Sequence, residues 1–164
     1  MSSVNKNLSH IEGSEIPSAI GYKFGIVYSE WNNEITNALK EGALTTLLAS
    51  GAKNENIIIK TVPGSFELTL GAQYLAENTD VDAVICLGCV IQGETRHFDF
   101  ICDAVAKGIT DLNIKYKLPF VFGVLTPNNQ QQSIDRAGGK HGNKGDEAAV
   151  TAIKMLSLRD SFKK

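Results

Sequence analysis

The segment VIQGETRHFD, residues 90–99, combines residue types that can bind an anion and transfer a proton. Main-chain N–H groups at the start of a helix lack partners within the helix, and the helix dipole favours an anion there. The spacing predicts a phosphate monoester on the main chain of Glu94 and Thr95, with Glu94 in the first helical turn. His97 follows closely, and an imidazole can transfer protons at neutral pH. A histidine that only caps or fills the end of a sheet fits the position equally well.

The same segment excludes a nucleotide-hydrolysing loop. Gly88 and Gly93 are spaced as in the phosphate-binding pattern GxxxxGK[ST], but Glu94 stands where that pattern requires lysine. A carboxylate there would repel the nucleotide phosphates. Arg96 could be a second phosphate ligand, although a solvated surface charge is the more frequent role for such a residue.

Two further segments carry an aromatic residue among polar ones. Trp31 lies in SEWNN and Phe66 lies in PGSFE. An exposed ring is unfavourable in water unless it stacks on something flat, so core packing is the alternative, and it is favoured for Phe66. Ser65 and Glu67 flank Phe66 with a hydroxyl and a carboxylate, as binding of a polyol chain would require. Ser65 could also cap a following helix.

A cluster of cations, Arg136, Lys140 and Lys144, lies in and before the loop GGKHGNKG, residues 138–145. The loop is expected to be too rich in glycine for regular structure, which would leave these side chains free to reach an anion. Isolated surface charges are the alternative.

The cysteines are expected to be structural. Cys86 and Cys89 form a CxxC within the apolar run DAVICLGCV, and side chains three apart in a strand point to opposite faces. They should be small buried hydrophobic residues, and so should Cys102. The histidines have no metal-ligand spacing with one another or with the cysteines, so no metal is expected.

The chain alternates apolar strand patterns with amphipathic helix patterns. Strands are predicted at 22–29, 56–62, 82–91 and 119–126. Helices are predicted at 33–49, 65–77, from about 94, 129–137 and 145–158. Apolar strands that are each followed by a helix indicate a three-layer α/β/α sandwich with a central parallel sheet, of the flavodoxin-like type. Ligands bind such sheets at the carboxyl ends of the strands.

The 164 residues predict one domain at 22–164 after an extended N-terminal arm at 1–21, a kind of segment that often packs on a neighbouring subunit. The net charge of −2 gives no reason to expect nucleic acid or an anionic membrane as a partner. The first twenty residues show no signal-peptide pattern, and no run of apolar residues could span a membrane. A cytoplasmic protein with a small-molecule or protein partner is expected.

The segments EWNNEIT, VPGSFELTL, GCVIQGETRHFDF, LPFVFGVLT and DRAGGKHGNKG together resemble the lumazine synthase family of riboflavin biosynthesis. The resemblance extends from about residue 22 to the end, and GETRHFDF and RAGGKHGNKG are its most specific parts. It implies a transferase that condenses 5-amino-6-(D-ribitylamino)uracil with 3,4-dihydroxy-2-butanone 4-phosphate, releasing phosphate and water, without cofactor or metal.

The resemblance also implies roles for individual residues. His97 would transfer protons, Trp31 would stack on the pyrimidine, segment 65–67 would hold the ribityl amine, and the main chain of 89–91 would pass along the ring edge. The substrate-binding positions implied are Trp31, Ser65, Phe66, Glu67, Cys89, Val90, Ile91, Glu94, Thr95, Phe122, Arg136 and Lys144.

Some of these roles imply a site shared between two chains. Glu94 and Thr95 would cradle the phosphate, and Arg136 would pair with it. Phe122 and Arg136 would come from an adjacent subunit, and Lys144 would lie near the uracil oxygens. Members of the family form homopentamers, and the short glycine-rich loop resembles that of members that assemble into sixty-subunit icosahedral capsids.

Two other functions compete with this interpretation. A flavin-binding module of the flavodoxin type would share the fold, but it needs a hydroxyl- and glycine-rich loop after the first strand, and SEWNNE does not supply one. A non-catalytic, shell-forming paralogue is the other alternative, and the number of matched site positions argues against it.

Overall fold

The protein contains a four-stranded sheet in the order β2-β1-β3-β4, in a computed structural model that describes residues 16–163. The strands are β1 (Phe24–Ser29), β2 (Ile57–Val62), β3 (Ala83–Cys89) and β4 (Phe120–Leu125). All three neighbouring pairs are parallel. The predicted parallel sheet is therefore confirmed.

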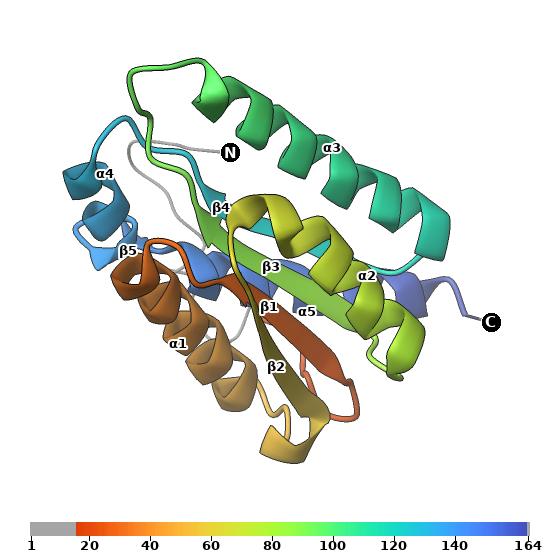
Figure 1. Ribbon diagram of the computed structural model, residues 1–164. Helices are drawn as coiled ribbons and strands as arrows, with labels where there is room; N and C mark the ends of the chain where they lie inside the picture. The colour runs from red at the N-terminus through yellow and green to blue at the C-terminus, as the bar shows by residue number, and fades with distance from the viewer. Residues whose placement is uncertain (1–15, 164) are drawn as a thin grey trace.

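Helices cover both faces of this sheet, which gives three layers (Figure 1). The α-helices are α1 (Asn33–Ala49), α2 (Leu68–Asn78), α3 (His97–Tyr116), α4 (Gln130–Asp135) and α5 (Lys144–Ser161). Helices α2 and α3 pack on one face, and α1 and α5 pack on the other. Short 3-10 turns, η3 (Asn54–Asn56) and η4 (Ser65–Glu67), precede β2 and α2.

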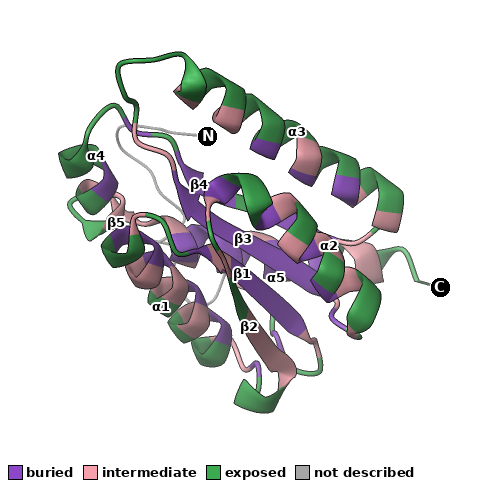
Figure 2. Cartoon of the chain, viewed as in Figure 1, coloured by how far each residue is buried: buried purple, intermediate pink, exposed green. Residues whose placement is uncertain are grey.

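The strand alternation divides the core into two halves, one on each side of the sheet. In β1, Phe24 and Ile26 face α1 and α5, whereas Val27 faces α2 and α3. Strand β3 is buried along its whole length, as its continuous purple colour in Figure 2 shows. Full burial of one valine, leucine, isoleucine or phenylalanine side chain contributes about 1.5–3 kcal/mol to the stability of the fold. Cys86 lies in one half and Cys89 in the other, so the expectation that their side chains point to opposite faces of the sheet is confirmed.

The last part of the predicted N-terminal arm packs on the chain's own core. Ile16 is partly buried against the α1 and α5 side, and Ala19 is fully buried. The N–H of Ala19 donates to the carbonyl of Ser50 at 2.8 Å. The rest of the arm, residues 1–15, lies outside the described residues.

The expectation that residues 138–145 lack regular structure is wrong. They contribute to an antiparallel hairpin formed by β5 (Ala137–Gly139) and β6 (Gly142–Asn143). Gly138 has φ +106° and Gly142 has φ +76°, values that residues with a Cβ rarely adopt. These glycines therefore permit a tight hairpin where their number had suggested an irregular loop.

Strand β1 lies between β2 and β3. The chain runs from β1 to β2 on one side, and from β3 to β4 on the other side of the sheet. The order reverses at this point, and ligands of doubly wound sheets bind outside the carboxyl ends of the strands there. The segments that follow β1, β2 and β3 are therefore the ones that could form a site.

Candidate active site

A cavity of about 670 Å³ lies at the carboxyl ends of β1, β2 and β3. Pockets for small molecules typically measure about 300–1,000 Å³. Its lining residues come from the segments after the three strands and from the start of α3. They are Trp31, Asn32, Gly64, Ser65, Phe66, Glu67, Cys89, Val90, Ile91, His97 and Ile101. The fold thus brings together eight of the residues singled out in the sequence.

Main-chain hydrogen bonds join the segments that form the cavity. After β1, the N–H of Glu30 donates to the carbonyl of Val62 at 2.8 Å, and the N–H of Trp31 donates to the carbonyl of Pro63 at 3.1 Å. After β3, the N–H of Val90 donates to the carbonyl of Leu125 at 2.8 Å. These bonds extend the sheet pairing beyond the strands, so the cavity is lined by backbone that is held in place.

Two aromatic rings at the cavity are exposed. Trp31 is 72% exposed and Phe66 is 55% exposed. The core role favoured for Phe66 is therefore wrong, because η4 turns Phe66 outward while Leu68, the first residue of α2, is fully buried. Rings in this position can stack on a flat ligand and remove its apolar surface and their own from water.

Ser65 does not cap the following helix as predicted. The helix α2 begins at Leu68, and the carboxylate of Glu67 accepts a hydrogen bond from the N–H of Gly64 at 3.1 Å. Ser65 is only 7% exposed, and its Oγ has no hydrogen-bond partner within residues 16–163. A buried hydroxyl without a partner costs about 1–3 kcal/mol. A ligand hydroxyl that reached Ser65 would remove this penalty.

Asn32 is a cavity residue that the sequence reasoning missed. Its backbone is left-handed, with φ 59°, immediately before α1. Its side-chain amide donates to the main-chain carbonyl of Cys89 at 2.9 Å and so links the ends of β1 and β3. The sequence signal that could have pointed to Asn32 is its position directly before a predicted helix, since asparagine tolerates the left-handed conformation better than most residues. Ile101 of α3 also reaches the cavity.

His97 is the first residue of α3; it lines the cavity and is exposed. The alternative in which it fills the end of the sheet does not fit this position. Glu94 and Thr95 precede the helix, so the prediction that Glu94 lies in its first turn is wrong. Both are exposed, and the hydroxyl of Thr95 accepts a hydrogen bond from the N–H of His97 at 3.4 Å. Arg96 pairs with Asp99 at 3.4 Å, with both side chains largely in solvent.

The remaining predicted residues do not line this cavity. Phe122 is an exposed residue of β4, at the edge of the sheet. Arg136 and Lys144 both pair with the buried carboxylate of Glu147, so the expectation that they are free is wrong. Lys140 pairs with Asp135 at 3.7 Å.

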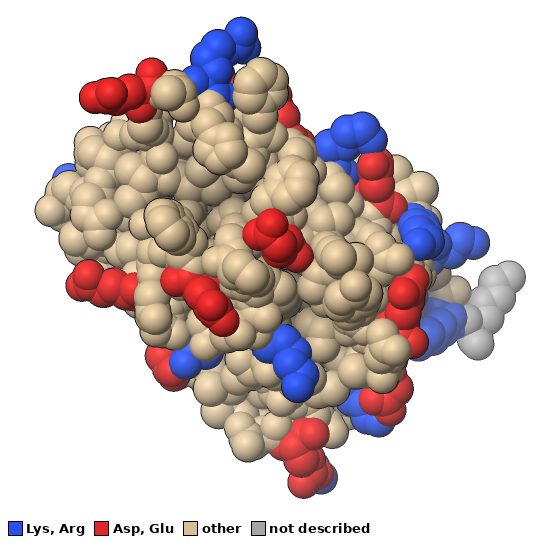
Figure 3. All heavy atoms as spheres, in the orientation of Figure 1, with Lys and Arg blue, Asp and Glu red and all other residues tan. Residues whose placement is uncertain are grey.

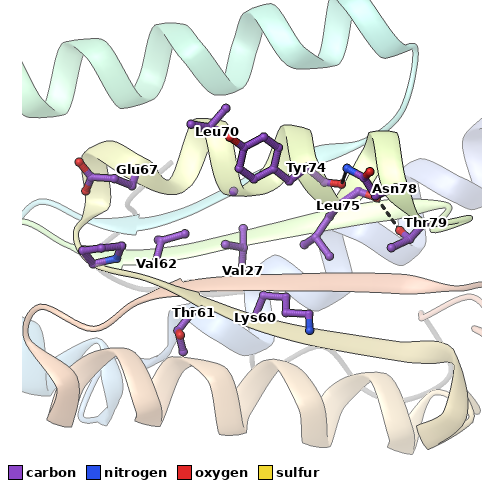
Figure 4. Close-up of a pocket in the computed structure, with 12 residues that line it drawn as sticks. Val27, Lys60, Thr61, Val62, Glu67, Leu70, Tyr74, Leu75, Asn78 and Thr79 are labelled. Carbon is purple, nitrogen blue, oxygen red and sulfur yellow. Dashed lines mark hydrogen bonds between the residues drawn. The ribbon is translucent and has the colours of Figure 1, made fainter.

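A second cavity, of about 600 Å³, lies between β2 and α2 (Figure 4). Val27, Val62, Leu70 and Leu75 give it mainly apolar walls. Of the predicted site residues only Glu67 reaches it, at one end. Its other polar lining residues are Lys60, Thr61, Tyr74, Asn78 and Thr79, none of which the sequence singled out.

The cysteines are poor candidates for catalysis. Burial raises the pKa of Cys86 to about 12 and also raises the pKa of Cys89, which keeps both in the weakly nucleophilic thiol form. Cys102 is less buried than expected.

Residues 16–163 contain no group of side chains arranged to hold a metal ion and no helix suited to crossing a membrane. The face of the molecule in Figure 3 carries lysine, arginine, aspartate and glutamate interspersed, with uncharged surface between them.

Comparison with known proteins supplies the family. The sequence profile described as 6,7-dimethyl-8-ribityllumazine synthase matches residues 21–160. A protein of that name from Cytophaga hutchinsonii is 64% identical over 157 residues, which cover 96% of this chain and 98% of the relative. Another, from Parabacteroides distasonis, is 56% identical over 96% of this chain and 99% of the relative. A third, from Phocaeicola vulgatus, is 49% identical over 100% of this chain and 98% of the relative. The chain therefore belongs to the 6,7-dimethyl-8-ribityllumazine synthase family.

Proposed function

We propose that this protein condenses 5-amino-6-(D-ribitylamino)uracil with 3,4-dihydroxy-2-butanone 4-phosphate to give 6,7-dimethyl-8-ribityllumazine, inorganic phosphate and two molecules of water. The observation that supports this most directly is the convergence of His97, two exposed aromatic rings and a buried, unpartnered hydroxyl on one cavity. Family membership over nearly the whole chain gives independent support.

The shape and polarity of the cavity fit the pyrimidine substrate. In the proposed complex Trp31 stacks on the pyrimidine ring, and the main chain at 89–91 passes its edge. The ribityl chain lies along Ser65, Phe66 and Glu67, where its hydroxyls provide the partner that the Ser65 hydroxyl lacks. The carboxylate of Glu67 can accept further hydrogen bonds from the sugar hydroxyls.

The chemistry requires repeated proton transfer. The 5-amino group of the pyrimidine attacks the ketone, and loss of water gives an imine. Removal of a proton then expels the phosphate as a leaving group, and ring closure releases the second water. In this proposal His97 transfers the protons, an imidazole role that typically contributes about 10²- to 10⁴-fold. Because both substrates are reactive in water, holding them together would supply much of the remaining acceleration.

The proposed phosphate site involves groups outside the cavity of a single chain. Glu94 and Thr95 would bind the phosphate through main-chain N–H groups next to His97. Phe122, Arg136 and Lys144 do not line the cavity, which agrees with a role at the cavity of an adjacent subunit. We therefore propose a homo-oligomer with its active site between subunits, a pentamer and, by resemblance of the 138–145 loop, a sixty-subunit capsid. Location in the cytoplasm stays a prediction from the sequence.

The decisive experiment mixes the purified protein with both substrates and follows the fluorescence of the lumazine and the release of inorganic phosphate. Equal amounts of the two products, with rates proportional to protein concentration, are expected. Protein that assembles but forms neither product would instead support a shell-forming paralogue. Protein that purifies with stoichiometric FMN and is inactive would support a flavin-binding module. Sedimentation velocity would distinguish a pentamer from a capsid.

A further inference from the structure

Glu147 is a carboxylate that is buried between two cations. It lies in the first turn of α5 and is only 5% exposed. Its Oε2 accepts a hydrogen bond from Nζ of Lys144 at 2.8 Å, and its Oε1 lies 3.6 Å from Nη2 of Arg136. Each carboxylate oxygen thus contacts a different cation. Burial of an ionised carboxylate is strongly unfavourable without such partners.

The backbone brings the two cations to the same place. Arg136 and Lys144 lie at the two ends of the hairpin formed by β5 and β6, and the N–H of Lys144 donates to the carbonyl of Arg136 at 2.9 Å. Figure 1 shows β5 beside the first turns of α1, at the end of the molecule where α3 also begins. The hairpin therefore lies near the carboxyl-end edge of the sheet.

The charges of this cluster do not cancel. Arg136 and Lys144 carry two positive charges and Glu147 carries one negative charge, which leaves one positive charge. The next cation of the hairpin, Lys140, is paired with Asp135. Glu147 therefore restrains both cations, and these three ion-paired side chains together retain one positive charge that can attract an anion.

We propose that Glu147 is a positioning residue that fixes Arg136 for binding the phosphate-bearing substrate, with Lys144 as the second cation that holds the Glu147 carboxylate in place. This inference rests on the proposed function, and Glu147 itself touches no substrate in it. Long cationic side chains lose considerable conformational entropy when they are immobilised. Glu147 restrains them before the substrate arrives, so binding of the substrate does not have to order them.

The test compares Glu147→Gln with Asp146→Asn. The first substitution keeps the shape of the side chain and removes its charge. The second removes the same charge from the adjacent first-turn residue, whose carboxylate is half-buried and interacts with Thr46. Steady-state kinetics would be measured for each substrate, together with competitive inhibition by inorganic phosphate.

Glu147→Gln is expected to raise the KM for the butanone phosphate and the inhibition constant of inorganic phosphate about 10- to 100-fold. The KM for the uracil substrate and kcat should each change less than about threefold, and Asp146→Asn should leave all four constants within that range. An unchanged or lower KM for the butanone phosphate in Glu147→Gln would overturn the inference, since simple electrostatics predicts tighter anion binding once a negative charge is removed.

A double-mutant cycle tests whether Glu147 acts through Arg136. Arg136→Ala alone should chiefly raise the KM for the butanone phosphate, and adding Glu147→Gln should then have a much smaller effect than in the wild type. Full additivity would overturn the inference. If Glu147→Gln does not fold, Glu147→Asp carries the test, because it keeps the charge and moves it away from the cations. Glu147→Asp is expected to raise the KM for the butanone phosphate about threefold or more, and an unchanged KM would contradict the positioning role.

A failure of the proposed function can be told apart from a failure of this inference. Wild-type protein that forms no lumazine would refute the function. Calorimetric titration with inorganic phosphate would still test the positioning role, since Glu147→Gln should bind phosphate at least about tenfold more weakly than wild type. Equal affinity would overturn it.

Discussion

The side-chain amide of Asn32 donates a hydrogen bond to the main-chain carbonyl of Cys89 across 2.9 Å and links the ends of two neighbouring parallel strands. Both residues line the cavity that holds the proposed site. Asn32 also occupies a left-handed conformation directly before α1. This one residue therefore both shapes the turn into α1 and fixes a wall of the cavity.

Substitutions of Asn32 should separate these two contributions. Asn32→Gly removes the hydrogen bond but accepts φ 59° readily, whereas Asn32→Ala loses the bond and also strains the backbone. We expect Asn32→Gly to lower the free energy of unfolding by about 1 kcal/mol and Asn32→Ala by about 2 kcal/mol. Urea unfolding of the three proteins measures this. Equal losses for the two variants would mean that the left-handed conformation contributes nothing.

His97→Ala should lower kcat about 10²- to 10⁴-fold without abolishing turnover, because binding and orientation of the substrates would persist. Since His97 is exposed at the cavity, added imidazole should restore part of the rate. The control is Trp31→Ala, which should weaken binding of the uracil substrate and should not respond to imidazole. A steady-state rate of His97→Ala equal to that of the wild type would remove His97 from the mechanism.

The sheet and the cavity could be predicted because their signals are local. An apolar run such as DAVICLGCV indicates a buried strand, and the rule that ligands bind at the carboxyl ends of parallel strands then points to Trp31, segment 65–67 and His97. Eight predicted residues line one cavity for this reason.

The features that were missed depend on contacts between distant parts of the chain. Glu147 in the sequence GDEAAV is typical of an acidic residue in the first turn of a helix, and only the fold shows that Arg136 and Lys144 bury it. The glycine-rich loop could not be recognised as a hairpin because β5 and β6 contain only three and two residues. Phe66 was assigned to the core by its residue type, which does not reveal the outward turn of η4.

Gly145 allows α5 to begin against the backbone of α1. A Cβ added to it would lie 1.8 Å from the carbonyl oxygen of Leu39, which fixed backbone cannot accommodate. We expect Gly145→Ala to lower the free energy of unfolding by about 1–3 kcal/mol or more, the range for overpacking. Gly93→Ala is the control, because its Cβ would meet nothing within 4 Å, and its stability should be unchanged or slightly higher. Urea unfolding of both variants checks the prediction, and similar stabilities would contradict it.

At the opposite end of the sheet, the hydroxyl of Tyr22 donates to Oδ2 of Asp160 at 2.6 Å and so links the chain just before β1 to the end of α5. Hydrogen bonds from Lys163, Tyr22 and Arg159 hold the pKa of Asp160 well below its usual range. The pKa of Tyr22 is raised, first by its hydrogen bond to Asp160. The fold therefore favours the ionised carboxylate and the neutral phenol.

These shifts predict a loss of stability in both acid and alkali. A carboxyl with a lowered pKa contributes stability above its unfolded pKa of about 3.9, and this is lost as the pH falls below that value. A phenol with a raised pKa contributes stability below its unfolded pKa of about 10, and this is lost as the pH rises through the folded value. In Tyr22→Phe the part of the alkaline loss that is due to Tyr22 should disappear. The acid loss should become smaller but persist, because Lys163 and Arg159 still pair with Asp160. Urea unfolding of wild type and Tyr22→Phe across the pH range measures both, and identical pH dependence in the two proteins would show that the contact contributes nothing to folding.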